Sequence, residues 1–186
     1  MTSIKVAVIV ANVDPSSPLS AKILSILVAN NRPALATSDI RITPVFLVGW
    51  LFVLSGALIR HACFRAMGNL FTFELSMRKD HRLITSGPYS VVRHPSYTGL
   101  IMAILGCFLC YLSGGSWLRE CSWLSLNGTV GTGVRLLISA WVVGGFSLVL
   151  GVVARIDKED TMLRKEFREW DQWARNVPWK LIPFVY

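Results

Sequence analysis

The sequence predicts an all-α, polytopic integral membrane protein with about three clear transmembrane helices, an N-terminal helical hairpin and a C-terminal amphipathic helix. Hydrophobic residues make up 53% of the chain, and the mean hydropathy is +0.50. Charged residues make up only 16%, whereas soluble domains carry roughly 25%. Long uncharged runs alternate with polar segments, as expected of helices that cross a bilayer. A chain of this length is expected to form one membrane domain, residues 1–186.

The first thirty residues are expected to form two short or tilted helices. Ile4–Val13 is too short to cross a bilayer, and Asp14–Pro18 interrupts the apolar pattern before Leu19–Ala29 resumes it. A signal peptide is the alternative, because Lys5 precedes an apolar core and small residues. That core is short and little positive charge precedes it, so the helical hairpin is favoured.

The next apolar stretch is the first expected span. It begins at Thr43-Pro44, where proline suits the first turn of a helix, and continues from Val45 through Phe64. Arg60 and Arg65 are expected to extend their charged groups to the interface.

Two more uncharged stretches, Pro95–Leu118 and Leu136–Ala154, complete the set of expected spans. Gly144, Gly145 and Gly151 in the last of them are expected to allow close helix packing. Beyond Ile156 the apolar residues recur at intervals of four, three and four, with charges between them. This spacing predicts an amphipathic helix on or near the membrane surface, with its apolar side made of Leu163, Phe167, Trp170 and Ala174.

The net charge of +8 raises the possibility of a nucleic-acid partner. The basic residues flank apolar spans, however, so they are better explained as topology signals and contacts to anionic headgroups, and no nucleic-acid partner is expected. Residues 60–95 carry six Lys or Arg and residues 155–186 carry seven, whereas the loop between the last two spans carries only Arg119 and Arg135. Two crossings separate the basic segments, which therefore lie on the same side, the cytosolic one by the positive-inside rule.

The chain has four cysteines, of which Cys107 and Cys110 form a C-x-x-C pair inside an uninterrupted apolar run. No second pair and no histidine lies in that run, so neither zinc binding nor redox chemistry is expected, and no metal site is assigned.

The segment His81–Gly99 is the most unusual part of the chain, because it concentrates His, Arg, Pro, Tyr and Gly between two apolar runs. Arg93-His94-Pro95 places a cation and an imidazole at the start of a membrane helix, whose first N–H groups can bind an anion or a carboxylate. At the end of the last span, Arg155 and Glu159 are four residues apart and share one helix face. The shared topology allows these two stretches to meet.

Each of these residues also has an ordinary explanation. Arg155 and Glu159 could be an interfacial pair worth a few tenths of a kcal/mol. His94 could cap a helix, and Tyr89 and Tyr97 could belong to the aromatic belt of a membrane protein. Only their occurrence together on one side of the membrane points to a site.

Two longer motifs now indicate a family. The first is Leu83-Ile84-Thr85-Ser86-Gly87-Pro88-Tyr89, followed by Val92-Arg93-His94-Pro95-Ser96-Tyr97-x-Gly99. The second is Arg155-x-x-x-Glu159-Asp160-x-x-Leu163, followed by Phe167, Trp170, Val177-Pro178 and Ile182-Pro183-Phe184. In spacing and order they resemble the isoprenylcysteine carboxyl methyltransferase family, over about residues 60–186.

The resemblance implies an integral membrane enzyme that uses S-adenosyl-L-methionine to methylate the C-terminal carboxylate of a prenylated cysteine, left after CaaX processing. Its partners would be the lipid bilayer and prenylated protein C-termini, and in a eukaryote it would lie in the endoplasmic reticulum membrane with its site facing the cytosol. Arg155 matches the residue that holds the substrate carboxylate. The positions that match cofactor contacts are Glu74, His81, Arg82, Leu83, Ile84, Tyr89, His94, Pro95, Ser96, Tyr97 and Glu159.

The chain also departs from the family pattern. Glu159-Asp160 stands where Glu-Glu is usual, and Glu74 where glutamine is frequent. The usual Phe-Gly-x-x-Tyr-x-x-Tyr pattern reads Phe167-Arg168-Glu169-Trp170-Asp171-Gln172-Trp173, so both tyrosines are lost. These differences bear on recognition of the lipid substrate more than on cofactor binding.

Three other functions share parts of the pattern. A phospholipid or small-isoprenoid methyltransferase would use the same cofactor, but methylation of an amine releases a proton, and only His81 or His94 could accept it. A membrane sterol-type reductase using NADPH has an ending similar to Val177–Tyr186, although such chains are much longer. A non-catalytic membrane adaptor could keep the fold, but the presence of both Arg155 and Glu159 argues against it.

Overall fold

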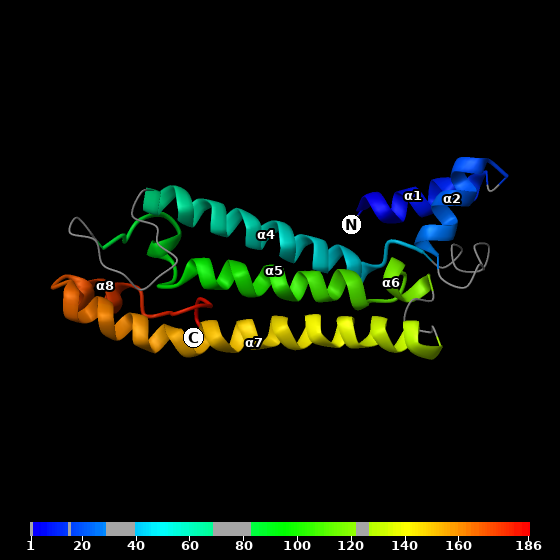
Figure 1. Ribbon diagram of the computed structural model, residues 1–186. Coiled ribbons are helices and arrows are strands. Elements are labelled where there is room, and N and C mark those ends of the chain that lie inside the picture. The colour runs from blue at the N-terminus through cyan, green and yellow to red at the C-terminus, as the bar shows by residue number, and fades with distance from the viewer. Residues whose placement is uncertain (1, 15, 29–39, 69–82, 122–126) are drawn as a thin grey trace. The chain divides into compact units, whose positions relative to one another are not determined.

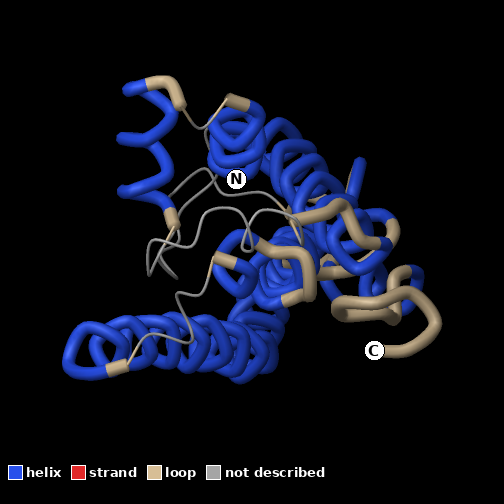
Figure 2. The backbone as a smooth tube through the Cα atoms, turned by 90° about the vertical axis from the view of Figure 1, so that its right-hand side faces the viewer, coloured by secondary structure: helices blue, strands red, loops and turns tan. Residues whose placement is uncertain are grey.

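A computed structural model describes residues 2–14, 16–28, 40–68, 83–121 and 127–186 of the chain. Every regular element among these residues is helical (Figure 2). The helices are α1 (Thr2–Val13), α2 (Pro18–Leu27), α4 (Pro44–Met67), η3 (Gly87–Ser90), α5 (Pro95–Leu112), α6 (Trp117–Glu120), α7 (Gly128–Glu166) and α8 (Trp170–Asn176) (Figure 1). Three stretches, Pro44–Met67, Pro95–Glu120 and Gly128–Glu166, are long and apolar enough to cross a membrane, which confirms the predicted fold class.

Two helices end at places that differ from the sequence prediction. α5 ends at Leu112 rather than Leu118, because the chain turns through Gly115, whose φ of +74° suits glycine, before the short helix α6. α7 begins at Gly128 rather than Leu136 and continues without a break to Glu166. The charged residues after Ala154 do not end this helix, because most are strong helix formers and no Gly or Pro follows until Pro178. The amphipathic repeat is therefore divided between α7 and α8.

The described chain forms two compact units. The first contains residues 1–51 and 105–144. Within it, α1 and α2 pack against each other, as the predicted hairpin requires, and the indole of Trp117 donates to the carbonyl of Leu27 at 2.8 Å. Six buried side chains of this unit gather in one cluster, which consists of Val8, Ala11, Leu24, Val28, Ile40 and Cys121.

The second unit contains residues 52–104 and 145–186. Its helices α4 and α5 approach closely at Gly56 and Gly99. A Cβ atom on Gly99 would lie 2.7 Å from the carbonyl oxygen of Gly56 and 2.9 Å from Cγ of Arg60, and one on Gly56 would meet the carbonyl oxygen of Gly99. The expectation of close packing at Gly144 and Gly151 is not met, since among the described residues no atom lies within 4 Å of a Cβ placed at either.

The C-terminal part of the second unit packs on the segment before α5. Trp170, Trp173 and Val177 are buried in one apolar cluster, against which Leu163, Phe167, Ala174, Leu83 and Tyr89 pack. The apolar positions predicted for one amphipathic side are thus grouped together, although they come from α7, α8 and the turn between them. Leu83 and Tyr89 pack against this cluster, so α8 contacts the first sequence motif.

We predict that Gly56→Val destabilises the protein, because the new methyl groups would meet the backbone of α5. Overpacking of this kind costs about 1–3 kcal/mol, which corresponds to a melting point several degrees lower. Thermal unfolding in detergent, followed with a thiol-reactive dye at the buried Cys63, Cys110 and Cys121, measures the change. Gly144→Val, where the added side chain has open space, is the matched control; equal losses in the two variants would contradict the close crossing.

Candidate functional site

The site is built on the first turn of α5. Pro95 occupies the first helical position, as predicted, and its fixed φ suits that place. The carbonyl of His94 accepts from the N–H groups of Tyr97 and Thr98 at 3.0 and 3.2 Å. The helix therefore starts at the Arg-His-Pro motif itself, which points His94 and Tyr97 toward the end of α7.

The C-terminal segment holds the residues just before this helix. The N–H groups of Arg93 and His94 donate to the carbonyls of Trp179 and Lys180, both at 2.9 Å. The backbone of the motif is thus fixed on both sides, by its own helix and by a segment more than eighty residues further along the chain.

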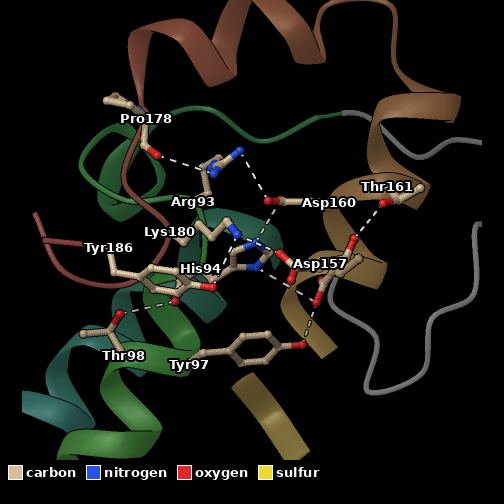
Figure 3. Close-up of polar contacts among 11 residues, drawn as sticks. Arg93, His94, Tyr97, Thr98, Asp157, Asp160, Thr161, Pro178, Lys180 and Tyr186 are labelled. Carbon is tan, nitrogen blue, oxygen red and sulfur yellow. Dashed lines mark hydrogen bonds and ion pairs between the residues drawn. The ribbon is translucent and has the colours of Figure 1, made fainter. Parts of the chain in front are cut away.

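Side chains of α5 and α7 meet directly at this point (Figure 3). The Tyr97 hydroxyl donates to Oε2 of Glu159 at 2.6 Å, and Nε2 of His94 lies 3.0 Å from Oδ1 of Asp160. Nδ1 of His94 lies 4.0 Å from Oε2 of Glu159, and the His94 and Tyr97 rings stack with their centroids 5.5 Å apart. The predicted meeting of the two stretches is confirmed.

Asp160 joins two residues of the first motif, and sequence reasoning did not select it. Its second carboxylate oxygen pairs with Nη1 of Arg93 at 3.3 Å, and both side chains are about nine-tenths buried, with 11% and 10% exposed. Arg93 also donates to the carbonyl of Pro178 at 3.4 Å, and its guanidinium lies over the ring of Trp170. The only sequence signal for Asp160 was its place beside Glu159, and Arg93 was noted as part of a motif without a role.

A more exposed ion pair lies beside this cluster. Nζ of Lys180 donates to Oδ1 of Asp157 at 2.7 Å and to the Tyr186 hydroxyl at 3.3 Å (Figure 3). The hydrogen bond to Asp157 raises the pKa of Lys180, so the ammonium stays charged at neutral pH. Because Asp157 is largely exposed, this pair contributes little to stability.

The two arginines nearest the motif differ in their surroundings. Arg155 lies one helical turn before Glu159 on the same face of α7, half-buried and within electrostatic range of the Tyr97 phenol. Arg60 donates to the carbonyl and hydroxyl of Ser96, in the first turn of α5, at 3.2 and 3.3 Å. The missing side chain of Gly99 makes room for the Arg60 stem, which explains this orientation.

The remaining predicted positions lie before α5. Leu83 packs on the Trp170 cluster and Ile84 is half-buried. The Tyr89 hydroxyl donates to Sδ of Met67 at 3.1 Å, and burial raises the pKa of the phenol, which therefore keeps its proton. Glu74, His81 and Arg82 lie outside the described residues.

This arrangement can attract a cation. The Glu159 carboxylate lies beside the ring of Tyr97, and both kinds of group attract positive charge. The Nε atom of Arg93 and the Nε1 atom of Trp170 are buried donors without a hydrogen-bond partner among the described residues. A ligand with acceptor atoms would satisfy them. No group of three or more metal-ligating side chains occurs in the described part of the chain.

Comparison with known proteins finds the same family among the matches. The model of the isoprenylcysteine carboxyl methyltransferase family matches residues 48–114, which include the Arg-His-Pro motif but end before Arg155 and Glu159. The chain is 32% identical, over 141 residues and 74% of its length, to protein-S-isoprenylcysteine O-methyltransferase B of Arabidopsis thaliana, of which it covers 58%. The resemblance found in the sequence is therefore confirmed.

Relatives with other names also match. The chain is 31% identical over 106 residues to the Delta(14)-sterol reductase TM7SF2 of Mus musculus, covering 56% of this chain and 20% of the reductase. It is 28% identical over 104 residues to the nickel-cobalt-cadmium resistance protein NccN of Alcaligenes xylosoxydans xylosoxydans, covering 56% of this chain and 38% of that protein. The chain spans less than two thirds of the length of these three relatives. No solved structure gives a significant match.

We predict that Asp160→Asn lowers stability strongly, because it leaves the buried Arg93 without a counter-charge. Breaking a buried pair in this way costs about 3–5 kcal/mol. Thermal unfolding of the purified protein measures the loss. The matched control is Asp171→Asn, which breaks the exposed pair with Arg164 and should cost less than about 1 kcal/mol. Similar melting points for both variants would show that the Asp160 contacts are not maintained in the protein.

Proposed function

We propose that this protein transfers a methyl group from S-adenosyl-L-methionine to the C-terminal carboxylate of a prenylated cysteine. The observation that carries the proposal is the 2.6 Å hydrogen bond from Tyr97 to Glu159, since it joins the two family motifs into one site with Arg155 one turn away. The relatives named as prenylcysteine methyltransferases support the same activity.

The side chains present suit the proposed cofactor. Its ammonium and sulfonium groups are cations, which the Glu159 carboxylate and the Tyr97 ring would attract. Its carboxylate and adenine present acceptor atoms, for which the buried N–H groups of Arg93 and Trp170 are candidate donors. When bound, the cofactor supplies an electrophilic methyl group on positively charged sulfur.

The chemistry proposed needs no general base. A C-terminal carboxylate is already ionised at neutral pH, so no proton has to be removed before its oxygen attacks the methyl carbon. The cofactor would supply the methyl group to the carboxylate oxygen, and the electron pair of its carbon–sulfur bond would stay on sulfur. Arg155 would hold and orient the carboxylate, and Glu159 would hold the polar end of the cofactor. Such positioning can supply roughly 7–11 kcal/mol of the barrier reduction.

The lipid part of the substrate is proposed to come from the bilayer. The prenyl chain would enter sideways between spans, along apolar residues of α5 and α7. The protein would act on CaaX-processed protein C-termini and, in a eukaryotic cell, would lie in the endoplasmic reticulum membrane with the site toward the cytosol. The concentration of Lys and Arg in residues 60–95 and 155–186 supports that orientation.

A single assay separates this proposal from its alternatives. Purified protein in detergent is incubated with methyl-labelled S-adenosyl-L-methionine and N-acetyl-S-farnesyl-cysteine. Base-labile label on the farnesyl cysteine supports carboxyl methylation. Cofactor binding without such transfer, but with label on lipid amines, would instead indicate a phospholipid methyltransferase. Absence of cofactor binding would favour a reductase or an adaptor.

We predict that Arg155→Ala lowers kcat/KM for farnesyl cysteine by about 10- to 100-fold, the value of one hydrogen-bonded interaction with a charged group. Cofactor affinity, measured by calorimetry, should change little, since the arginine is assigned to the substrate. Lys158→Ala, at an exposed position on the same helix, serves as the control. Full methylation by Arg155→Ala at low substrate concentration would disprove the assigned role.

Glu159→Gln is predicted to act on the other reactant. Loss of its charge should weaken S-adenosyl-L-methionine binding by about 10-fold or more, because a charge-assisted interaction is lost. Calorimetric titration of the variant gives the dissociation constant, and Glu166→Gln, an exposed glutamate of α7, is the matched control. An unchanged dissociation constant would remove Glu159 from the cofactor site.

A further inference from the structure

The segment Leu181–Tyr186 forms a tight turn that exposes large apolar side chains. Phe184 is 84% exposed, Val185 72% and Ile182 51%. Phe184 has a φ of +66°, in the left-handed region that residues other than glycine seldom adopt. An exposed cluster of this kind in an aqueous setting would be unfavourable, so its surroundings need an explanation.

The backbone of this turn satisfies most of its own polar groups. The N–H groups of Leu181 and Ile182 donate to the main-chain oxygen of Tyr186 at 2.7 and 2.9 Å. Those of Val185 and Tyr186 both donate to the carbonyl of Ile182 at 3.1 Å, and Pro183 has no N–H group. Backbone that enters an apolar phase must be satisfied internally, and four of the five N–H groups of this turn meet that condition.

The turn also lies at the level of a membrane-spanning helix. The carbonyl of Leu181 accepts from the hydroxyl of Thr98 at 2.7 Å, and Thr98 is in the first turn of α5, inside the candidate span. The residues just before the turn are of the kind found at membrane interfaces: Trp179, and Lys180, whose ammonium reaches Asp157 and the Tyr186 hydroxyl. Polar groups therefore lie at one end of the segment and exposed apolar groups at the other.

We propose that the Leu181–Tyr186 turn inserts into the boundary between headgroups and acyl chains, where Ile182, Phe184 and Val185 contact lipid. Lipid is the expected partner of these side chains. The contact with Thr98 places the turn beside a candidate membrane-spanning helix, and such a helix is surrounded by the bilayer. The inserted turn anchors the segment that holds Arg93 and His94 through Trp179 and Lys180. This inference does not depend on the reaction proposed above.

The test uses a single fluorescent label on the full-length protein in lipid nanodiscs. Phe184→Cys is labelled with a nitrobenzoxadiazole group and exposed in turn to acyl-chain spin-labelled phosphatidylcholine and to iodide. Leu150→Cys on α7, inside a span and exposed, is the lipid reference, and Gln172→Cys on α8 is the aqueous reference. All three variants are made in a Cys107→Ser background, because Cys107 is only partly buried whereas Cys63, Cys110 and Cys121 are buried, and the Cys107→Ser protein without a further substitution gives the background labelling.

The expected result is quenching of the Phe184 label by the spin-labelled lipid, close to that at Leu150 and several-fold stronger than at Gln172, with little effect of iodide. Strong iodide quenching without lipid quenching would place the turn in water and overturn the proposal. Quenching by neither agent would show that protein, such as a second copy, covers the turn, which also overturns it. Val185→Cys repeats the measurement if the Phe184 variant does not fold.

Discussion

The carboxylate of Asp160 is the contact on which the rest of the site depends. It binds His94 through one oxygen and Arg93 through the other, and all three side chains are about nine-tenths buried or more. Taking such charges out of water costs several kcal/mol per ion, so each partner is needed to offset the burial of the others. The same contact fixes where α5 begins relative to α7, because Arg93 and His94 directly precede the first turn of α5.

Three neighbouring acidic residues of α7 are held by three different partners. Asp157 binds Lys180, Glu159 binds Tyr97, and Asp160 binds His94 and Arg93. Successive residues of a helix are about 100° apart around its axis, so these three side chains lie on one side of α7, within an arc of about 160°. Three separate partners on this side oppose rotation of the helix about its axis. Arg155 is on the same helix, so the contacts that fix the orientation of α7 also fix the direction in which Arg155 leaves the helix.

The sequence predicted the helices well, because crossing a bilayer requires about twenty apolar residues and few patterns meet that demand. It also predicted that the stretch around His94 and the stretch from Arg155 to Asp160 could meet, because topology placed both on the same side of the membrane. The function of Asp160 could not be predicted, since its burial and its partners arise from tertiary contacts and neighbouring carboxylates look equivalent in sequence. The helix crossing shows the same limit: composition pointed to Gly144 as a packing glycine, whereas α4 and α5 approach at Gly56 and Gly99, where Arg60 also packs.

The order of residues along α7 bears on how two unlike reactants could meet. Arg155 precedes Glu159 by four residues, so it lies about 6 Å further from the C-terminal end of the helix, toward its apolar part. Under the proposed function, the group for the lipid-linked carboxylate is thus on the membrane side and the group for the water-soluble cofactor is nearer the surface. Because one rigid helix carries both, the separation between carboxylate and cofactor does not depend on loop movement. A prenylated substrate could then bring its carboxylate to Arg155 while its chain stays in the bilayer, which avoids the cost of exposing that chain to water.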